Sequence, residues 1–175
     1  MKSLILGGVR SGKSRLAETI ARNSSKKVVY IATATAGDEE MKARILKHKQ
    51  HRPGDWMIVE EAIHLANAIQ EHSKPDACIL VDCVTLWLTN LLLATNKSLL
   101  QLERDNLLNT LKEIDQEIIF VSNETSMGII PLGELSRQFG DEAGVTNQNL
   151  AAVCDRVILT VAGLPLTLKG EKYEH

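Results

Sequence analysis

The sequence predicts an α/β protein in which helices cover both faces of a mostly parallel sheet. Short apolar runs alternate along the chain with longer stretches of helical periodicity, a pattern that is typical of parallel strands joined by right-handed helical crossovers. A glycine-rich segment follows the first apolar run directly, where many nucleotide-binding sheets carry a phosphate loop. No linker, repeat or low-complexity segment interrupts the 175 residues. We therefore expect one domain over 1–175, with a disordered polar tail at 170–175.

The elements of the first half follow from the length and period of each apolar run. Short, wholly apolar runs indicate strands that are buried on both faces. Pairs of apolar residues one helical turn apart, such as Leu16 and Ile20, indicate amphipathic helices. Pro53 and Gly54 interrupt the pattern once. We expect strands at 4–6, 28–31 and 57–59, and helices at 13–22, 38–49 and 61–71.

The second half repeats the alternation with more apolar helices. The continuous apolar run 78–81 is typical of a strand covered on both faces. A loop that contains Gly128, Pro131 and Gly133 separates the later elements. We expect strands at 78–81, 118–121, 157–161 and 166–168, and helices at 86–94, at 99–114 and over a stretch that ends at 155.

Composition excludes several classes of protein. The net charge is −2 and only six residues are aromatic, so we expect neither nucleic-acid binding nor attachment to an anionic membrane. No apolar run reaches the roughly 18 residues of a membrane-spanning helix. The three cysteines fit no zinc-binding spacing, and Cys78 and Cys154 lie in or next to apolar runs. We expect core thiols in a reducing compartment and a cytoplasmic protein.

The glycine-rich segment matches the phosphate-loop pattern G-x-x-x-x-G-K-[ST]. Glycines let the backbone wrap closely around phosphates, and the start of the following helix favours negative charge. A glycine-rich turn that matches by chance is the alternative, and the flanking strand and helix disfavour it. Residues expected to bind a nucleoside triphosphate here are Gly7, Gly8, Val9, Arg10, Ser11, Gly12, Lys13 and Ser14.

Asp82 stands at the carboxyl end of the most apolar predicted strand. Ligands gather at that edge of open α/β sheets, and a phosphate-loop protein usually needs an acidic residue near its Mg²⁺ ion. We expect Ser14 and Asp82 to bind Mg²⁺. The alternative is that Asp82 only caps the next helix.

A basic cluster lies between the second and third predicted strands. Arg44 and His48 are four residues apart and so share one face of the expected helix, and Lys47 and His51 share an adjacent face, with Arg52 directly after. Such a cluster suits phosphate groups, and a neutral imidazole can also attack an α-phosphate and carry the nucleotidyl group. On residue types alone, a solvated basic face is the commoner explanation.

The chain resembles the bifunctional adenosylcobinamide kinase / adenosylcobinamide-phosphate guanylyltransferase family of cobalamin biosynthesis nearly from end to end. An Arg inside the phosphate loop is one shared feature. The other shared segments are Tyr30-Ile31-Ala32-Thr33-Ala34, Arg44-Ile45 with His48, Arg52-Pro53, Trp56, Glu60, the run from Asp82 to Leu92, Val121-Ser122-Asn123-Glu124, Met127 to Pro131, Asn147-Gln148, Leu150-Ala151, Asp155-Arg156-Val157 and Gly163-Leu164-Pro165-Leu166.

The resemblance implies a P-loop NTPase with a RecA-like sheet that assembles as a homotrimer. It implies that ATP or GTP phosphorylates a small-molecule corrinoid, adenosylcobinamide, and that GMP then passes from GTP through an enzyme histidine to the corrinoid phosphate. The residue that matches the family's acceptor histidine is His48. Lys47 stands where some members have a second histidine, and Thr125-Ser126 stands where Val-Gly is frequent.

By the same resemblance, GTP contacts extend beyond the phosphate loop. The residues concerned are Ala32, Thr33, Ala34, Lys49, Gln50, His51, Arg52, Glu60 and Asp82. Two other functions remain open at this point. One is a small-molecule kinase without the guanylyl step, and the other is a nucleotide-dependent switch that binds partner proteins.

Overall fold

The strands of the chain form a single sheet in the computed structural model, which describes residues 1–35, 39, 54–125, 127–128 and 130–173. Within these residues the sheet has seven strands in the order β3-β2-β4-β5-β1-β6-β7. All neighbours pair in parallel except β6 and β7. The strands are β1 (Lys2–Gly7), β2 (Lys27–Ala32), β3 (Met57–Glu60), β4 (Ala77–Asp82), β5 (Glu117–Asn123), β6 (Arg156–Val161) and β7 (Leu164–Lys169).

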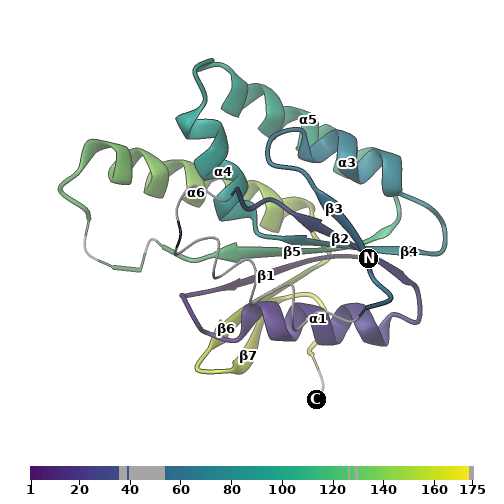
Figure 1. Cartoon of the computed structure of the whole chain (residues 1–175). Coiled ribbons are helices and arrows are strands. Elements are labelled where there is room, and N and C mark those ends of the chain that lie inside the picture. Colours follow the sequence, from purple (N-terminus) through teal and green to yellow (C-terminus); the bar gives the residue numbers. More distant parts are fainter. Residues whose placement is uncertain (36–38, 40–53, 126, 129, 174–175) are drawn as a thin grey trace.

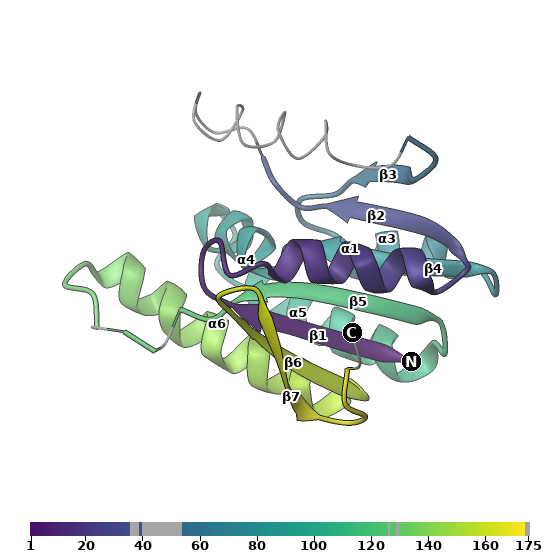
Figure 2. The same cartoon turned by 90° about the horizontal axis from the view of Figure 1, so that it is seen from below.

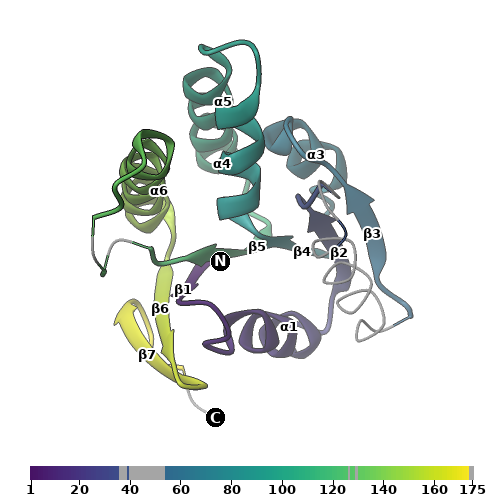
Figure 3. The same ribbon diagram turned by 60° about the vertical axis from the view of Figure 1, so that its left-hand side comes forward.

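Helices cover both faces of this sheet, as the alternation of elements predicts. Figure 3 shows α1 below the sheet and the other labelled helices above it. Two groups of buried side chains, one on each face, make the core. The helices are α1 (Lys13–Asn23), α3 (Leu65–His72), α4 (Val84–Leu93), α5 (Leu99–Glu113) and α6 (Glu134–Val153).

Several predicted boundaries were wrong. The helix expected from 61 begins at Leu65, because the Glu61 carboxylate accepts hydrogen bonds from the N–H groups of Ile63 and His64 and holds a turn there. The helix expected from 86 begins at Val84. The last strand begins two residues early and includes Pro165, which an edge strand tolerates.

The core is aliphatic with a few large aromatic side chains. Trp87, Tyr30 and Phe120 are among its largest fully buried residues. The three cysteines are free and buried, as the sequence predicts for Cys78 and Cys154. Near the carboxyl end, Tyr173 packs against the core on the α1 face and its N–H donates to the Thr167 hydroxyl. No described helix is both long and apolar enough to cross a membrane.

The expected helix at 38–49 cannot be compared with the structure, because residues 36–38 and 40–53 lie outside the described part of the chain.

Candidate active site

Five strand ends meet at one edge of the sheet. The parallel register pairs Gly7 with Asn123, and it pairs Ala32 with both Asp82 and Glu60. The ends of β2, β3 and β4 therefore lie level with one another. The ends of β1 and β5 extend two residues further, because Asp82 pairs with Val121 and β5 continues to Asn123. In Figure 1 the phosphate loop leaves β1 at this edge and turns back into α1.

Two glycines allow the phosphate loop to fold as tightly as it does. A Cβ atom on Gly7 would lie 2.4 Å from the Ser11 Oγ and 2.6 Å from the Thr160 carbonyl oxygen. Gly12 has φ of 97°, a left-handed conformation that favours glycine. From Gly12 the chain enters α1 directly, with the Leu16 N–H donating to the Gly12 carbonyl oxygen at 3.0 Å. The sequence between these glycines is thus fixed in a narrow turn at the start of a helix.

The hairpin between β6 and β7 supports this loop from outside. Ala162 and Gly163 both have positive φ, as a two-residue hairpin turn of type I′ requires. The Gly163 N–H donates to the Ser11 carbonyl oxygen at 2.8 Å. A Cβ on Gly12 would lie 3.2 Å from the Gly163 Cα, so the two turns are in close contact. Figure 2 shows the β6–β7 hairpin beside the start of α1.

Lys13 is half-buried at the start of α1, and its ammonium group donates to the Gly8 carbonyl oxygen at 3.1 Å. Burial lowers the pKa of this amino group, and the nearby Asp82 carboxylate partly offsets the shift by favouring the charged form. A partly desolvated cation that rests on a neutral carbonyl gains stability from an anionic ligand. Lys13 is therefore suited to bind phosphate.

Asp82 is the last residue of β4. The sequence had predicted that it would be the first residue after the strand. Its Oδ2 accepts a hydrogen bond from the Tyr30 hydroxyl at 2.9 Å, and the Tyr30 ring is 1% exposed. The peptide bond that follows Asp82 is cis. The hydrogen bond from Tyr30 fixes one carboxylate oxygen, while the side chain as a whole stays half-exposed.

Ser14 and Asp82 fit the metal that we expected. Hydroxyl and carboxylate oxygens are ligands that Mg²⁺ prefers, and Mg²⁺ usually takes only one or two protein ligands together with phosphate oxygens. The described residues contain no group of three or more His, Cys, Asp or Glu side chains that could hold a metal ion. This donor set is consistent with a metal that is shared with a nucleotide.

The family model for cobinamide kinase / cobinamide phosphate guanyltransferase matches residues 3–168. The chain belongs to this family. Its members are transferases, and the family match agrees with the resemblance seen in the sequence.

Curated relatives match over the whole length of the chain. The bifunctional adenosylcobalamin biosynthesis protein CobP of Pseudomonas aeruginosa is 54% identical over 171 residues, which cover 98% of this chain and 99% of that protein. The bifunctional adenosylcobalamin biosynthesis protein CobU of Escherichia coli is 38% identical over 182 residues, covering 97% and 100% respectively. These relatives make the chain a member of a bifunctional family with kinase and guanylyltransferase activities.

Solved structures resemble the fold at low sequence identity. A Pyrococcus horikoshii protein has a TM-score of 0.57 and 13% identity, over 98% of this chain and 87% of that one. The P4 protein from bacteriophage phi6, solved in complex with ADP, has a TM-score of 0.50 and 15% identity, over 94% of this chain and 53% of that one. The predicted fold class, an α/β protein with a mostly parallel sheet, is confirmed.

The strand end at 32–34, where the family resemblance predicts nucleotide contacts, is mostly buried. Ala32 is 8% exposed and Thr33 is fully buried, whereas Ala34 is half-exposed. The Thr33 hydroxyl donates to the Cys83 carbonyl oxygen at 2.7 Å and accepts from the Cys83 N–H at 3.0 Å. Because this hydroxyl is bonded within the protein, Thr33 joins the ends of β2 and β4 together.

Three asparagines near this edge, Asn90, Asn123 and Asn147, were not among the site residues predicted from the sequence. Asn123 donates through Nδ2 to the Thr85 hydroxyl at 2.9 Å, and Asn147 accepts from the Ser122 hydroxyl at 2.7 Å. Asn90 contacts the ends of β2 and β3. Each lies in a segment that the family resemblance had marked, but only the fold shows which strands these amides join.

The remaining predicted contacts lie at the margin of the described structure or outside it. Glu60 is exposed at the carboxyl end of β3, beside Ala32 in the register. Thr125 is exposed after β5, and Ser126 lies outside the described residues. His48 also lies outside them, as do Lys47, Lys49, Gln50, His51 and Arg52.

Proposed function

We propose that the chain performs both reactions of its family on a corrinoid substrate. A nucleoside triphosphate phosphorylates the hydroxyl of the aminopropanol arm of adenosylcobinamide, and GMP from GTP is then joined to that phosphate to give adenosylcobinamide-GDP. The observation that carries the proposal is the half-buried Lys13 beside Asp82, on a phosphate loop, in a chain that matches bifunctional relatives over its whole length.

In the kinase reaction, the loop from Gly7 to Ser14 holds the triphosphate and Lys13 neutralises its β- and γ-phosphates. Ser14 and Asp82 would hold Mg²⁺, which when bound would screen the phosphate charge and help to orient the γ-phosphoryl group. The corrinoid hydroxyl attacks the γ-phosphorus, the bond to the β-phosphate oxygen breaks, and the hydroxyl proton leaves to solvent. Either ATP or GTP fits these residues as donor, because none of these contacts involves the base.

In the guanylyl transfer, His48 is the acceptor. An imidazole nitrogen attacks the α-phosphorus of GTP, and the bond to pyrophosphate breaks. A phosphate oxygen of the phosphorylated corrinoid then attacks the same phosphorus and displaces the imidazole, which restores the enzyme. Lys49, Gln50, His51, Arg52 and Glu60 are proposed to bind GTP in this step. We also propose that the protein acts in the cytoplasm as a homotrimer.

The test uses GTP labelled at the α-phosphate, incubated with wild type, with His48→Asn and with the control variant His72→Asn, which changes a histidine at the carboxyl end of α3. We expect a protein-bound label that is labile to acid and stable to base in wild type and in His72→Asn, and none in His48→Asn. All three proteins should still phosphorylate adenosylcobinamide, since the phosphate loop is unchanged.

Two results would contradict the proposal. If His48→Asn carries as much label as wild type, His48 is not the acceptor. If wild type phosphorylates the corrinoid but forms no labelled protein and releases no pyrophosphate from GTP, the chain is a kinase without the guanylyl step. Slow nucleotide hydrolysis with no transfer to the corrinoid would favour a nucleotide-dependent switch instead.

A further inference from the structure

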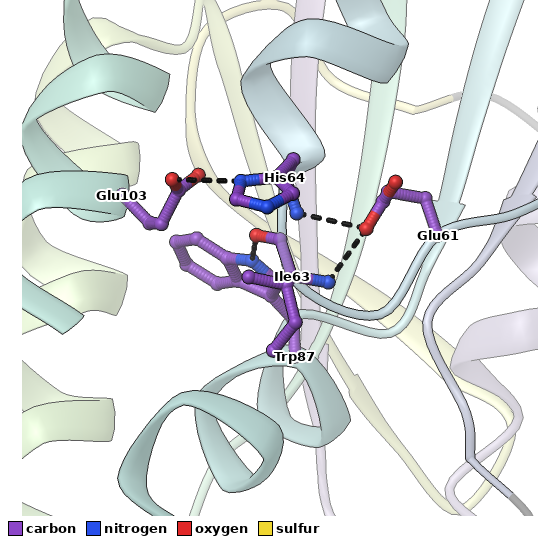
Figure 4. Close-up of polar contacts among 5 residues, drawn as sticks. All are labelled: Glu61, Ile63, His64, Trp87 and Glu103. Carbon is purple, nitrogen blue, oxygen red and sulfur yellow. Dashed lines mark hydrogen bonds and ion pairs between the residues drawn. The ribbon is translucent and has the colours of Figure 1, made fainter. Parts of the chain in front are cut away.

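The turn that follows β3 is anchored to two helices. Figure 4 shows its contacts: the Glu61 carboxylate accepts from the N–H groups of Ile63 and His64, both at 2.8 Å. The Trp87 indole N–H of α4 donates to the Ile63 carbonyl oxygen at 2.7 Å. The His64 Nδ1 lies 3.0 Å from the Glu103 Oε1 of α5.

These anchors are buried, which makes the turn a fixed part of the structure. Trp87 is fully buried and Glu103 is 4% exposed. Residue Trp87 also belongs to the large core group on this face of the sheet. A backbone segment that is tied to buried side chains from two helices has few ways to move without breaking several contacts at once.

Asn90 extends this anchoring to the end of β2. It lies three residues after Trp87 on α4, and so on the same side of the helix. Its Nδ2 donates to the Ala62 carbonyl oxygen of the anchored turn at 3.1 Å and to the Thr33 carbonyl oxygen at 2.8 Å. Its Oδ1 accepts from the Thr35 hydroxyl at 3.0 Å. The two carbonyl oxygens can only accept, so the amide orientation is chemically determined.

The end of β2 is therefore held from two directions. Cys83, next to Asp82, bonds the Thr33 hydroxyl from the β4 side. Asn90 bonds the Thr33 carbonyl and the Thr35 hydroxyl from the α4 side. Thr33 itself is fully buried, so these contacts act by fixing the chain that carries its neighbours Ala32 and Ala34.

We propose that Asn90 is a positioning residue for the nucleotide: it fixes the 33–35 segment so that the part of GTP beyond the triphosphate is bound. This inference rests on the proposed function and on the GTP contacts that the family resemblance predicts for Ala32, Thr33 and Ala34. Asn90 does not act on the phosphates, which belong to the phosphate loop after β1, and two strands, β4 and β5, separate β1 from β2.

The experiment separates the two parts of the ligand. Binding of Mg²⁺-GTP and of Mg²⁺ with inorganic triphosphate is measured for wild type, Asn90→Asp, Asn90→Ala and Thr89→Ala. Triphosphate reports only on the phosphate loop, whereas GTP also reports on the 33–35 segment. Thr89→Ala is the matched control, because the Thr89 hydroxyl bonds only the Thr85 carbonyl of its own helix among the contacts of the described residues.

We expect both Asn90 variants to raise the Kd for GTP about tenfold or more, the size expected when a partly buried carbonyl loses its donor. The Kd for triphosphate should stay within about twofold of wild type, and Thr89→Ala should change neither Kd. Asn90→Asp should be the weaker binder at neutral pH, because its carboxylate would face two carbonyl oxygens.

A pH series gives a readout that a loss of folding alone would not move. When protonated, the carboxyl group introduced by Asn90→Asp again has an O–H donor. The ratio of its Kd for GTP to that of Asn90→Ala should therefore fall as the pH is lowered from about 7 to about 4, through the usual pKa range of an Asp carboxyl group. Melting temperatures of all variants, measured without ligand, show whether each protein remains folded over this range.

Several outcomes would overturn the inference. They are an unchanged Kd for GTP in both Asn90 variants, an equal loss of GTP and triphosphate binding in folded variants, or wild-type GTP binding that is no tighter than triphosphate binding. Failure of wild type to bind either ligand is a different result, because it would contradict the proposed function itself.

Discussion

Replacing Tyr30 by Phe would remove one hydroxyl group beside Asp82 and leave the aromatic ring in place. That ring is 1% exposed and stacks against Trp56 with centroids 6.4 Å apart, so Phe should keep the same packing. The hydroxyl donates to the Asp82 Oδ2 at 2.9 Å. The substitution thus takes one hydrogen bond from a carboxylate that we propose as a magnesium ligand.

The magnitude follows from the charge of the acceptor. A hydrogen bond to a charged group contributes about 1.5–3 kcal/mol, and Asp82 is half-exposed, so water replaces part of the loss. We expect the free energy of unfolding to fall by about 1–1.5 kcal/mol, or roughly 2–5 °C in melting temperature for a chain of this length. Substitution of a residue that orients a metal ligand typically lowers metal affinity 10- to 100-fold. We expect about tenfold.

The assay measures the Mg²⁺ concentration that gives half the maximal rate of corrinoid phosphorylation at saturating nucleotide. This concentration should rise about tenfold in Tyr30→Phe, while the maximal rate at high Mg²⁺ changes much less because Lys13 and the phosphate loop are intact. Tyr173→Phe is the matched control. It makes the same chemical change in a tyrosine that packs against the same core group but follows β7, at the far edge of the sheet from β2.

A Tyr30→Phe protein with the Mg²⁺ requirement and melting temperature of wild type would refute this reasoning, because the hydroxyl would then have no effect on Asp82. A lower maximal rate that added Mg²⁺ does not restore would also contradict it. That result would assign Tyr30 a role in the reaction and not in holding a metal ligand.

Three further predictions concern the phosphate loop and the thiols. Gly7→Ala should destabilise the fold by about 1–3 kcal/mol, since its Cβ would meet the Thr160 carbonyl oxygen. Gly8→Ala has open space at its Cβ and should have a melting temperature near that of wild type. Equal melting temperatures for the two variants would contradict the close approach of Thr160 to Gly7. Burial lowers the pKa of Lys13, and bound phosphates favour its charged form, so triphosphate affinity should fall as the pH rises through that lowered pKa. Lys13→Arg stays charged and should show a flatter pH profile of triphosphate affinity. Identical pH profiles for the two proteins would exclude Lys13 as the cause of the pH dependence. Burial also raises the pKa of the three thiols, to about 11 for Cys78 and about 12 for Cys154, and in the same direction for Cys83. A thiol reagent at pH 8 should therefore label the three cysteines only after the protein unfolds. Fast labelling of the native protein would contradict this prediction.

The sheet could be predicted because its strands carry a strong local signal. Wholly apolar runs such as 78–81 and 118–121 have no stable place except between two layers of helices. The ends of the strands were harder to predict, because a polar residue ends the apolar run in the sequence while the strand still pairs with its neighbours. Asp82 illustrates this: it looks like the first loop residue, yet its backbone still pairs with Ala32 and Val121 in the sheet.

The turn before α3 shows why local periodicity can also mislead. Residues 61–71 contain a good helical pattern, but the Glu61 side chain bonds the N–H groups of Ile63 and His64. Acidic side chains commonly compete with helix hydrogen bonds in this way. Deciding which bond forms requires the positions of Trp87 and Glu103, which are supplied by helices later in the chain.

The part of the candidate site that one continuous motif forms could be predicted from the sequence. The contacts between residues that are far apart in the sequence could not. The phosphate loop is continuous in sequence, so its residues and its geometry come together. By contrast, Asn90 and Thr33 are 57 residues apart, and Tyr30 and Asp82 are 52 apart. Their contact depends on the strand order, which places β2 directly beside β4 and which the sequence pattern alone does not determine.

The long-range hydrogen bonds at this edge have a common effect. Tyr30 fixes Asp82, Cys83 and Asn90 fix Thr33, and the Asn123 amide bonds Thr85 at the start of α4. Each joins a strand end to a neighbouring strand or helix, so the proposed phosphate, metal and nucleoside contacts are held relative to one another before ligand arrives. Misplacement by about 1 Å can cost a reaction on the order of 100-fold in rate. A chain that serves the two proposed reactions at this edge gains from such fixed positions, and substitutions of the joining residues should impair activity while much of the core packing remains intact.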